Sequence, residues 1–172
     1  QLRLASNQPS AELSLRIPFS ELKQLWEKRL QERIPVQYLV GETPWRDFLL
    51  KVSPAVLIPR PETELLPEIA LNQANDELRK GHWVDLGTGS GAIALSLANA
   101  LPAATIHAVD NSLEAIAIAQ ENAQRHHLEN RIQFHHGSWF SPLTHLQGEI
   151  TAMVSNPPYI PTATLAELDP EV

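Results

Sequence analysis

The sequence contains no cysteine and only one methionine, Met153, among its 172 residues. The lack of cysteine excludes disulfides and thiolate metal sites and fits a reducing cytosol, so we expect a cytoplasmic protein. No run of about 18 apolar residues occurs, so the sequence predicts no membrane-spanning helix. No secretory signal pattern appears at its start. Hydrophobic residues still make up 43% of the sequence, which is enough to bury a core.

The sequence has fewer positively charged than negatively charged residues. Lysine and arginine number 13 against 20 acidic residues, and the formal net charge is −7. An acidic chain has no broad electrostatic footprint for nucleic acid, so we expect neither a direct nucleic-acid partner nor a membrane partner. The candidates for a local basic patch are Arg29, Arg33, Arg46 and Arg60, although scattered arginines are usually part of a solvated surface.

The domain organisation predicted here is an accessory segment over residues 1–55 and a core over residues 56–172. Residue 1 is Gln rather than Met, so we expect a fragment or a chain with missing ends. Ser20 is a plausible N-cap for an amphipathic helix over 20–33, with a buried face at Leu22, Leu25 and Trp26. Short strands are predicted at 37–40 and 48–52, joined by a turn at 41–46.

Residues 56–172 alternate between helix and strand patterns. A helix-start signal at Pro59 to Glu64 predicts a helix through about residue 79, with Gly81 as its C-cap. Further helices are predicted at 91–100 and 112–126, and strands at 83–86, 105–109, 132–135 and 150–155. Strands that alternate with helices imply parallel pairing, so the fold class is α/β, a doubly wound Rossmann-like sheet.

A glycine-rich loop, Asp85-Leu86-Gly87-Thr88-Gly89-Ser90-Gly91, joins the first core strand to a helix. Glycines there allow a tight turn and let the backbone approach a ligand closely. Asp110 ends the next strand, 23 residues after Gly87, where a carboxylate can bind both hydroxyls of a ribose. The spacing also satisfies the dinucleotide pattern, so the loop predicts a nucleoside-containing cofactor without deciding between a dinucleotide and S-adenosylmethionine.

A second motif, Asn156-Pro157-Pro158-Tyr159, follows the apolar run at 150–155. The prolines end that strand because neither can donate to a ladder. An asparagine amide carries one acceptor oxygen and two donor hydrogens, and open α/β sheets bind ligands at the carboxyl ends of their strands. The motif therefore predicts a site that holds a planar amide or amino group. The alternative is a plain strand-ending turn.

Together these residues resemble the class I S-adenosylmethionine-dependent methyltransferases and, more narrowly, the HemK/PrmC family, which methylates a glutamine side-chain nitrogen in peptide chain release factors. The resemblance covers about residues 35–172. Besides the two motifs above, Asp110 and Ser138-Trp139-Phe140, it rests on Pro35-Val36-Gln37-Tyr38-Leu39-Val40-Gly41 and Ile58-Pro59-Arg60-Pro61-Glu62-Thr63-Glu64. The resemblance implies S-adenosylmethionine as cofactor and a release factor as protein substrate.

The resemblance also implies a role for each matching residue. The loop residues Gly87, Thr88, Gly89, Ser90 and Gly91 would cradle the cofactor, Asp110 would bind its ribose, and Trp139 would lie beside its adenine. Asn156 and the Pro157 carbonyl would accept hydrogen bonds from the substrate amide, Tyr159 would pack on it, and Pro158 completes the substrate motif. The segment from Arg60 to Glu64 would close the pocket near the methionine end.

The sequence departs from the family pattern in three places. Ser138 stands where an acid is usual, the N-terminal helical domain is only partly present, and the C-terminal strands of the full sheet are absent after Val172.

Three other functions are alternatives to the one that the resemblance implies. They are an N6-adenine methyltransferase with the same tetrapeptide, a nicotinamide oxidoreductase, and an inactive cofactor-binding fragment.

Three further sets of residues have plainer explanations than chemistry. The pairs His126-His127 and His135-His136 resemble metal ligands, but adjacent side chains diverge on a helix and point to opposite faces of a strand, so we expect no metal site. Glu62 and Glu64 could form an acid/base pair, but first-turn acids are equally explained by the helix dipole. Trp139 and Phe140, taken without the resemblance, are more often core residues.

Overall fold

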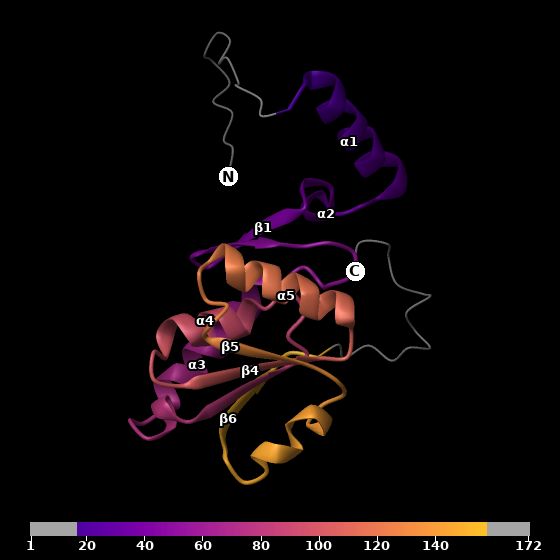
Figure 1. Cartoon of the computed structure of the whole chain (residues 1–172). Coiled ribbons are helices and arrows are strands. Elements are labelled where there is room, and N and C mark those ends of the chain that lie inside the picture. The colour runs from indigo at the N-terminus through magenta and orange to yellow at the C-terminus, as the bar shows by residue number, and fades with distance from the viewer. Residues whose placement is uncertain (1–16, 158–172) are drawn as a thin grey trace, which may run out of the picture.

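The computed structural model describes residues 17–157 (Figure 1). Pro158 and Tyr159 therefore lie outside the described residues. In chain order the elements are α1 (Phe19–Glu32), α2 (Val36–Val40), β1 (Glu42–Trp45), β2 (Phe48–Lys51), η1 (Pro61–Glu64), α3 (Leu65–Gln73), η2 (Leu78–Lys80), β3 (His82–Leu86), α4 (Ala92–Ala100), β4 (Thr105–Asp110), α5 (Leu113–Arg125), β5 (Ile132–His136), η3 (Ser141–Leu146) and β6 (Ile150–Ser155).

The central sheet confirms the predicted α/β class. Its strand order is β5-β4-β3-β6, and every pair is parallel. The chain winds outward from β3 through β4 to β5 and then returns to place β6 on the other side of β3. The carboxyl ends of β3 and β6 therefore lie at the point where the winding reverses, which is where open α/β sheets form a ligand crevice.

The main core lies on the face of the sheet that carries Trp83, which is 1% exposed. Helices α3, α4 and α5 cover this face, and η3 lies across the sheet from α4 and α5 (Figure 1). Helix α4 is rich in Ala and Leu, and all its residues from Ala92 to Ala98 are buried. The second face packs Val84, Leu86 and Val109 against η3.

A row of histidines crosses this second face. His82 Nδ1 lies 2.9 Å from His107 Nε2, and His107 Nδ1 lies 3.1 Å from His135 Nε2. The ring of His145 on η3 lies 6.3 Å from that of His135. Burial and the neighbouring histidines lower the pKa of His107 to about 4, and burial also lowers the pKa of His135. His107 is therefore a neutral core residue at pH 7.

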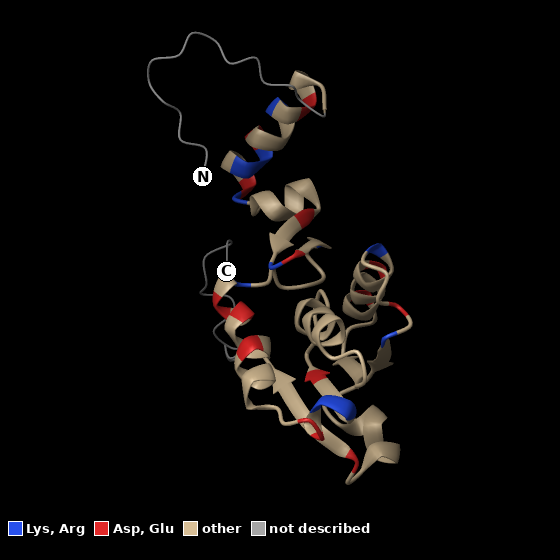
Figure 2. Ribbon diagram, turned by 90° about the vertical axis from the view of Figure 1, so that its left-hand side faces the viewer, with Lys and Arg blue, Asp and Glu red and all other residues tan. Residues whose placement is uncertain are grey.

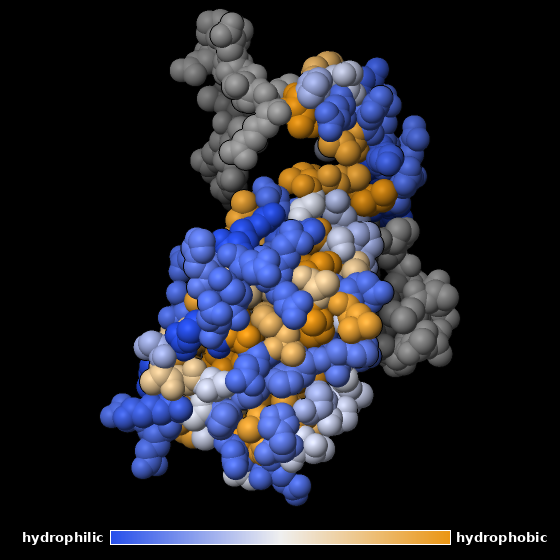
Figure 3. All heavy atoms as spheres, in the orientation of Figure 1, coloured by the Kyte–Doolittle hydropathy of each residue, from blue (hydrophilic) through white to orange (hydrophobic). Residues whose placement is uncertain are grey.

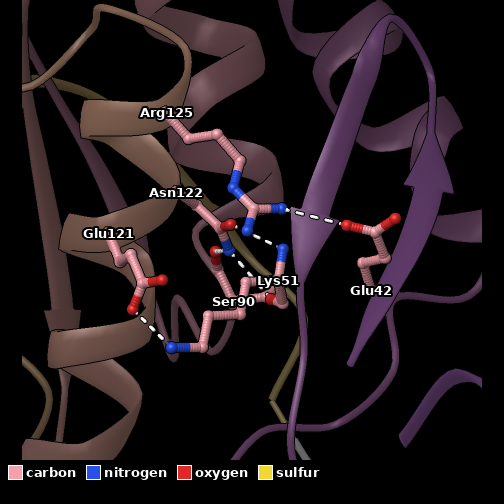
Figure 4. Close-up of polar contacts among 6 residues, drawn as sticks. All are labelled: Glu42, Lys51, Ser90, Glu121, Asn122 and Arg125. Atoms are coloured by element: carbon pink, nitrogen blue, oxygen red, sulfur yellow. Dashed lines mark hydrogen bonds and ion pairs between the residues drawn. The ribbon is translucent and has the colours of Figure 1, made fainter. Parts of the chain in front are cut away.

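The β1–β2 hairpin is fastened to α5 through Asn122, whose side chain is fully buried (Figure 4). Asn122 Oδ1 accepts from Lys51 N at 2.6 Å, and Nδ2 donates to Lys51 O at 3.0 Å and to Ser90 O at 2.8 Å. Lys51–Glu121 and Arg125–Glu42 ion pairs flank this contact. One amide thus joins the hairpin, α5 and the glycine-rich loop.

The prediction of a strand at 37–40 is wrong, because α2 occupies Val36–Val40. Pro35 precedes the helix, and Gly41 ends it with a φ of 79° while donating its N–H to Gln37 O. The hairpin therefore begins inside the predicted turn at 41–46, with Glu42 opposite Lys51, so that turn is wrong and only the second predicted strand is confirmed.

The helix predicted through residue 79 is also too long. It begins as η1, continues as α3 and ends at Gln73. Asn75 Oδ1 then accepts from Leu78 N and starts the separate turn η2, since an Asn side chain competes for local backbone donors. Gly81 caps η2, with an extended rather than a left-handed backbone.

Helix α1 lies one residue from its predicted range, but two details of the prediction are wrong. Its N-cap is Pro18 rather than Ser20. The apolar face is not buried, because Leu22 is 37% and Trp26 58% exposed and Leu25 is only half-buried. Figure 3 shows hydrophobic residues gathered where α1 faces α2. Basic and acidic residues alternate along the rest of α1 rather than forming a face of one sign (Figure 2).

Candidate active site

A cavity of about 440 Å³ opens at the carboxyl ends of β3, β4 and β6. This volume falls within the range of about 300–1,000 Å³ that is typical of small-molecule sites. Its lining comes from five segments of the chain: Ala55–Leu57, Leu86–Gly89 without Thr88, Val109–Ser112 with Ala115, Gly137–Trp139, and Asn156–Pro157. The structure thus brings together the glycine-rich loop, the acid after β4, the predicted tryptophan and the asparagine motif.

The glycine-rich loop leaves β3 by pairing with β4. The N–H groups of Gly87 and Thr88 both donate to Val109 O, at 2.9 and 3.0 Å. Gly87 and Gly89 have φ angles of 75° and 53°. A Cβ at Gly87 would have Pro157 Cα as its nearest neighbour, at 3.9 Å, and a Cβ at Gly89 would have none within 4 Å. These two glycines therefore leave open space beside the cavity, as expected for a backbone that a ligand approaches closely.

Thr88, Ser90 and Gly91, by contrast, do not line the cavity. Thr88 and Ser90 are buried, and Ser90 O receives the Asn122 hydrogen bond. At Gly91 a Cβ would lie 2.9 Å from Leu95 Cδ1 and 3.1 Å from Ala119 Cβ, so this glycine permits close packing of α4 on α5. Their cofactor contacts stay predictions, and in this structure they shape the loop.

Asp85 is a residue that the sequence reasoning did not assign to the site. Its Oδ2 accepts from Thr88 Oγ1 at 2.6 Å and from Ala94 N at 3.1 Å, and so ties the loop to α4. Its Oδ1 is buried without a hydrogen-bond partner among the described residues. Burial raises the pKa of Asp85 to about 7, against these hydrogen bonds, which lower it.

Asp110 occupies the predicted position at the end of β4 and lines the cavity. Its Oδ2 accepts from Gly89 N at 2.9 Å, and its Oδ1 accepts from Ser112 N at 3.0 Å. A carboxylate has about four acceptor positions, so both oxygens can still receive ligand hydroxyls. The Gly89 N–H, a donor that a pyrophosphate would use, is already engaged by a carboxylate. This arrangement disfavours a dinucleotide and suits a cationic ligand.

Trp139 lines the same cavity and is 59% exposed, so it is not a core residue. Its φ of 50° is unusual for a bulky residue, and such outliers cluster at ligand sites. Ser138 also lines the cavity. An exposed aromatic face beside an acid that can bind hydroxyls fits a nucleoside.

Asn156 and Pro157 follow β6 and close another side of the cavity. Asn156 Nδ2 donates to Thr63 Oγ1 at 2.9 Å. Thr63 belongs to a segment that we call the strap (residues 57–64), which runs from the cavity wall at Leu57 into η1. The closure of the pocket by Arg60 to Glu64 stays a prediction; within the strap, Thr63 contacts Asn156 and Leu57 lines the cavity.

The sequence did not indicate the role of Asn122 or the contact of Thr63 with Asn156. Each acts across a long separation, 71 residues from Asn122 to Lys51 and 93 from Thr63 to Asn156. The available signal was a polar Asn at a position that helical periodicity places on the apolar face of α5.

The histidine pairs diverge as their spacing predicts. His135 joins the row on the second face, whereas His136 Nε2 contacts Asn111 O. His126 lies against Phe48, edge to face. Within residues 17–157 no group of three or more His, Asp or Glu is placed to hold a metal ion. In the same range no helix combines the length and apolar character needed to cross a bilayer.

Comparison with solved structures agrees with this architecture. The chain superposes on the hMettl16 catalytic domain in complex with a 3′UTR hairpin with a TM-score of 0.54, at 18% identity, over 70% of this chain and 42% of that one. At this identity the likeness concerns the fold alone. The fold and the cavity together define a Rossmann-like α/β domain of the methyltransferase type.

The chain belongs to the methyltransferase small domain family, whose model matches residues 63–167. It is 54% identical to the release factor glutamine methyltransferase of Synechocystis sp. and 51% identical to that of Thermosynechococcus vestitus, each over 94% of this chain and 55% of the relative. The release factor glutamine methyltransferase of Vibrio cholerae is 49% identical over 73% of this chain and 43% of its own length. These relatives confirm the resemblance inferred from the motifs. The chain spans about half the length of the curated relatives it matches.

Proposed function

We propose that this chain carries the catalytic site of a methyltransferase that transfers a methyl group from S-adenosylmethionine to the side-chain nitrogen of a glutamine in a peptide chain release factor. The observation that carries the proposal is the position of Asn156 and Pro157, at the end of β6 and on the wall of the glycine-lined cavity. In this proposal residues 56–172 form the catalytic part, residues 1–55 an accessory part, and the protein works in the cytoplasm with its substrate.

The residues around the cavity suit S-adenosylmethionine. Asp110 would accept its ribose hydroxyls, Gly87 and Gly89 would let it approach the backbone, and Trp139 would stack on its adenine. Asp110 is the charged side chain among the lining residues, and its negative charge favours a sulfonium over a phosphate. When bound, the cofactor supplies a methyl group whose bond to sulfur breaks as the bond to nitrogen forms, and the electron pair of the broken bond stays on sulfur.

The substrate amide is a poor nucleophile because its nitrogen lone pair is delocalised into the carbonyl. Asn156 Oδ1 and the Pro157 carbonyl would accept its two N–H groups and favour a more sp³-like nitrogen that faces the methyl group. Tyr159 would pack on the amide plane, and the nitrogen would release one proton to solvent after transfer. Orientation of this kind contributes at best roughly 7–11 kcal/mol to lowering the barrier.

The test is methyl transfer from radiolabelled S-adenosylmethionine by the full-length protein, offered a release factor or nucleic acid. Asn156→Ala is expected to collapse kcat on the release factor while the affinity for S-adenosylhomocysteine changes little. The matched control is Asn130→Ala, an exposed asparagine outside the cavity. Unchanged turnover in Asn156→Ala would sink the assignment.

The same assay, together with a thermal-shift comparison of S-adenosylmethionine and NAD, separates the rival functions. An N6-adenine methyltransferase would label nucleic acid and leave the release factor unlabelled. A nicotinamide oxidoreductase would be stabilised against heat by NAD rather than by S-adenosylmethionine. Cofactor binding without transfer to either substrate would identify a cofactor-binding module without turnover.

A further inference from the structure

The strap brings a buried hydroxyl to Asn156, which is proposed to hold the substrate amide. Thr63 is 8% exposed and belongs to the short helix η1, where its N–H donates to Arg60 O at 3.0 Å. Its Oγ1 accepts from Asn156 Nδ2 at 2.9 Å, across 93 residues of sequence. This is a side-chain hydrogen bond between the strap and the end of β6.

This contact determines the orientation of the Asn156 side-chain amide, on which binding of the substrate amide depends. A side-chain amide can turn about its last bond, and a turn of 180° exchanges its oxygen with its nitrogen at little steric cost. A substrate N–H requires the oxygen. A threonine hydroxyl can donate as well as accept, but in the structure it accepts from Nδ2, so the contact holds the amide plane with Oδ1 on its other branch.

The strap itself is anchored on both sides of Thr63 by the tip of the β1–β2 hairpin. On one side Trp45, which is 2% exposed, donates Nε1–H to Arg60 O at 3.4 Å. On the other side an Arg46 guanidinium nitrogen donates to Glu64 O at 2.8 Å and to Glu68 Oε1 at 3.0 Å. The hydroxyl is therefore presented from a segment whose backbone is tied down before and after it.

We propose that Thr63 is a positioning residue for Asn156: its hydroxyl fixes the amide so that Oδ1 meets the substrate nitrogen. The proposal rests on the proposed function, in which Asn156 accepts the substrate N–H. A merely structural Thr63 would affect folding and leave turnover alone. A positioning Thr63 affects turnover and leaves cofactor affinity alone, since it does not line the cavity.

The test compares Thr63→Val, which keeps the shape without the hydroxyl, with Thr63→Ser, which keeps the hydroxyl, in the full-length protein. Thr43→Val is the control, because Thr43 is also a buried threonine, at 6% exposure, but it lies on the hairpin strand. Thr63→Val is expected to lower kcat roughly 10- to 100-fold, as misplacement of a positioning group does. The dissociation constant for S-adenosylhomocysteine should change less than about twofold, and Thr63→Ser should recover most of the rate.

A second readout does not depend on activity. The side-chain amide resonances of Asn156, assigned by their loss in Asn156→Ala, are followed by NMR without cofactor. Thr63→Val should shift them and speed their exchange with solvent, and Thr63→Ser should leave them close to wild type. Unchanged resonances in Thr63→Val overturn the inference whatever the substrate.

The kinetic outcomes separate this inference from the proposed function. Wild-type turnover by Thr63→Val, beside a collapse in Asn156→Ala, overturns the positioning role and leaves the proposed function standing. Absence of transfer by the wild-type protein to any release factor overturns the proposed function, and the NMR comparison then decides the Thr63–Asn156 contact alone.

Discussion

Replacing His107 by glutamine should change how the stability of the protein depends on pH. His107 is 1% exposed, and its pKa is about 4 in the fold against 6.5 in an unfolded chain. Between these values the unfolded chain binds a proton that the fold does not, so stability is full above pH 6.5 and falls as pH drops toward 4. The gap corresponds to at most roughly 3 kcal/mol.

Asp85 works in the opposite direction over the same range. Its pKa is about 7 in the fold against 3.8 in an unfolded chain, so the folded state holds the proton longer. Its contribution is therefore full below pH 3.8 and is lost as pH rises toward 7, by roughly 4 kcal/mol at most. The pH dependences that His107 and Asp85 contribute to the unfolding free energy are therefore nearly equal and opposite. In the wild-type protein each contribution masks the other.

The assay is urea unfolding at a series of pH values from 4 to 7.5, followed by tryptophan fluorescence, on wild type, His107→Gln and Asp85→Asn. As pH falls from 7 to 4, the unfolding free energy of His107→Gln relative to wild type should rise by about 3 kcal/mol. That of Asp85→Asn relative to wild type should fall by about 3 kcal/mol over the same range. His127→Gln, at an exposed position, is the control for loss of an imidazole. Curves for both variants that run parallel to wild type would refute the reasoning.

Two further predictions concern the frame of the site. Asn122→Ala should lower the unfolding free energy by roughly 3 kcal/mol, because it leaves the buried backbone groups of Lys51 and Ser90 without their hydrogen bonds to Asn122. A loss below about 1 kcal/mol in urea unfolding would contradict this. Gly91→Ala should lower the unfolding free energy by roughly 2–3 kcal/mol, because of backbone strain and contact with Ala119. Gly89→Ala has open space around its Cβ and should lower the unfolding free energy by only about 1 kcal/mol. Its main effect should be weaker binding of S-adenosylhomocysteine, measured by calorimetry. Equal destabilisation by the two glycine variants would speak against the division of roles within the loop.

Most of the sheet and its helices could be predicted because their signals are local. The runs at 83–86, 105–109, 132–135 and 150–155 contain β-branched or aromatic residues and lie between turn residues, and the structure has a strand at each of them. Residues 36–40 show the limit of such reasoning. Val36, Tyr38 and Val40 favour a strand by propensity, but Pro35 and Gly41 bracket a single helical turn, and tertiary context decides.

The candidate site divides in the same way. The motifs predicted which segments meet at the cavity, because parallel strands place their carboxyl ends at one edge of the sheet. They did not predict that Thr88 points toward Asp85 or that Thr63 holds Asn156. The Thr88 contact is local, across three residues, and depends on how the loop turns. The Thr63 contact depends on how the strap packs against the end of β6, which no spacing in the sequence encodes. The exposed face of α1 was missed for the same reason, since helical periodicity predicts an apolar face but not what covers it.

The histidine row has a direction. In both of its contacts an Nδ1 of one ring faces an Nε2 of the next, from His82 to His107 and from His107 to His135. A neutral imidazole carries a single N–H, so when the rings are neutral His107 donates to one neighbour and accepts from the other. If its proton sits on Nδ1, the proton of His82 must also sit on Nδ1, and His135 must accept through Nε2. The three rings therefore share one tautomer, and reversing the row requires all three protons to change nitrogen together.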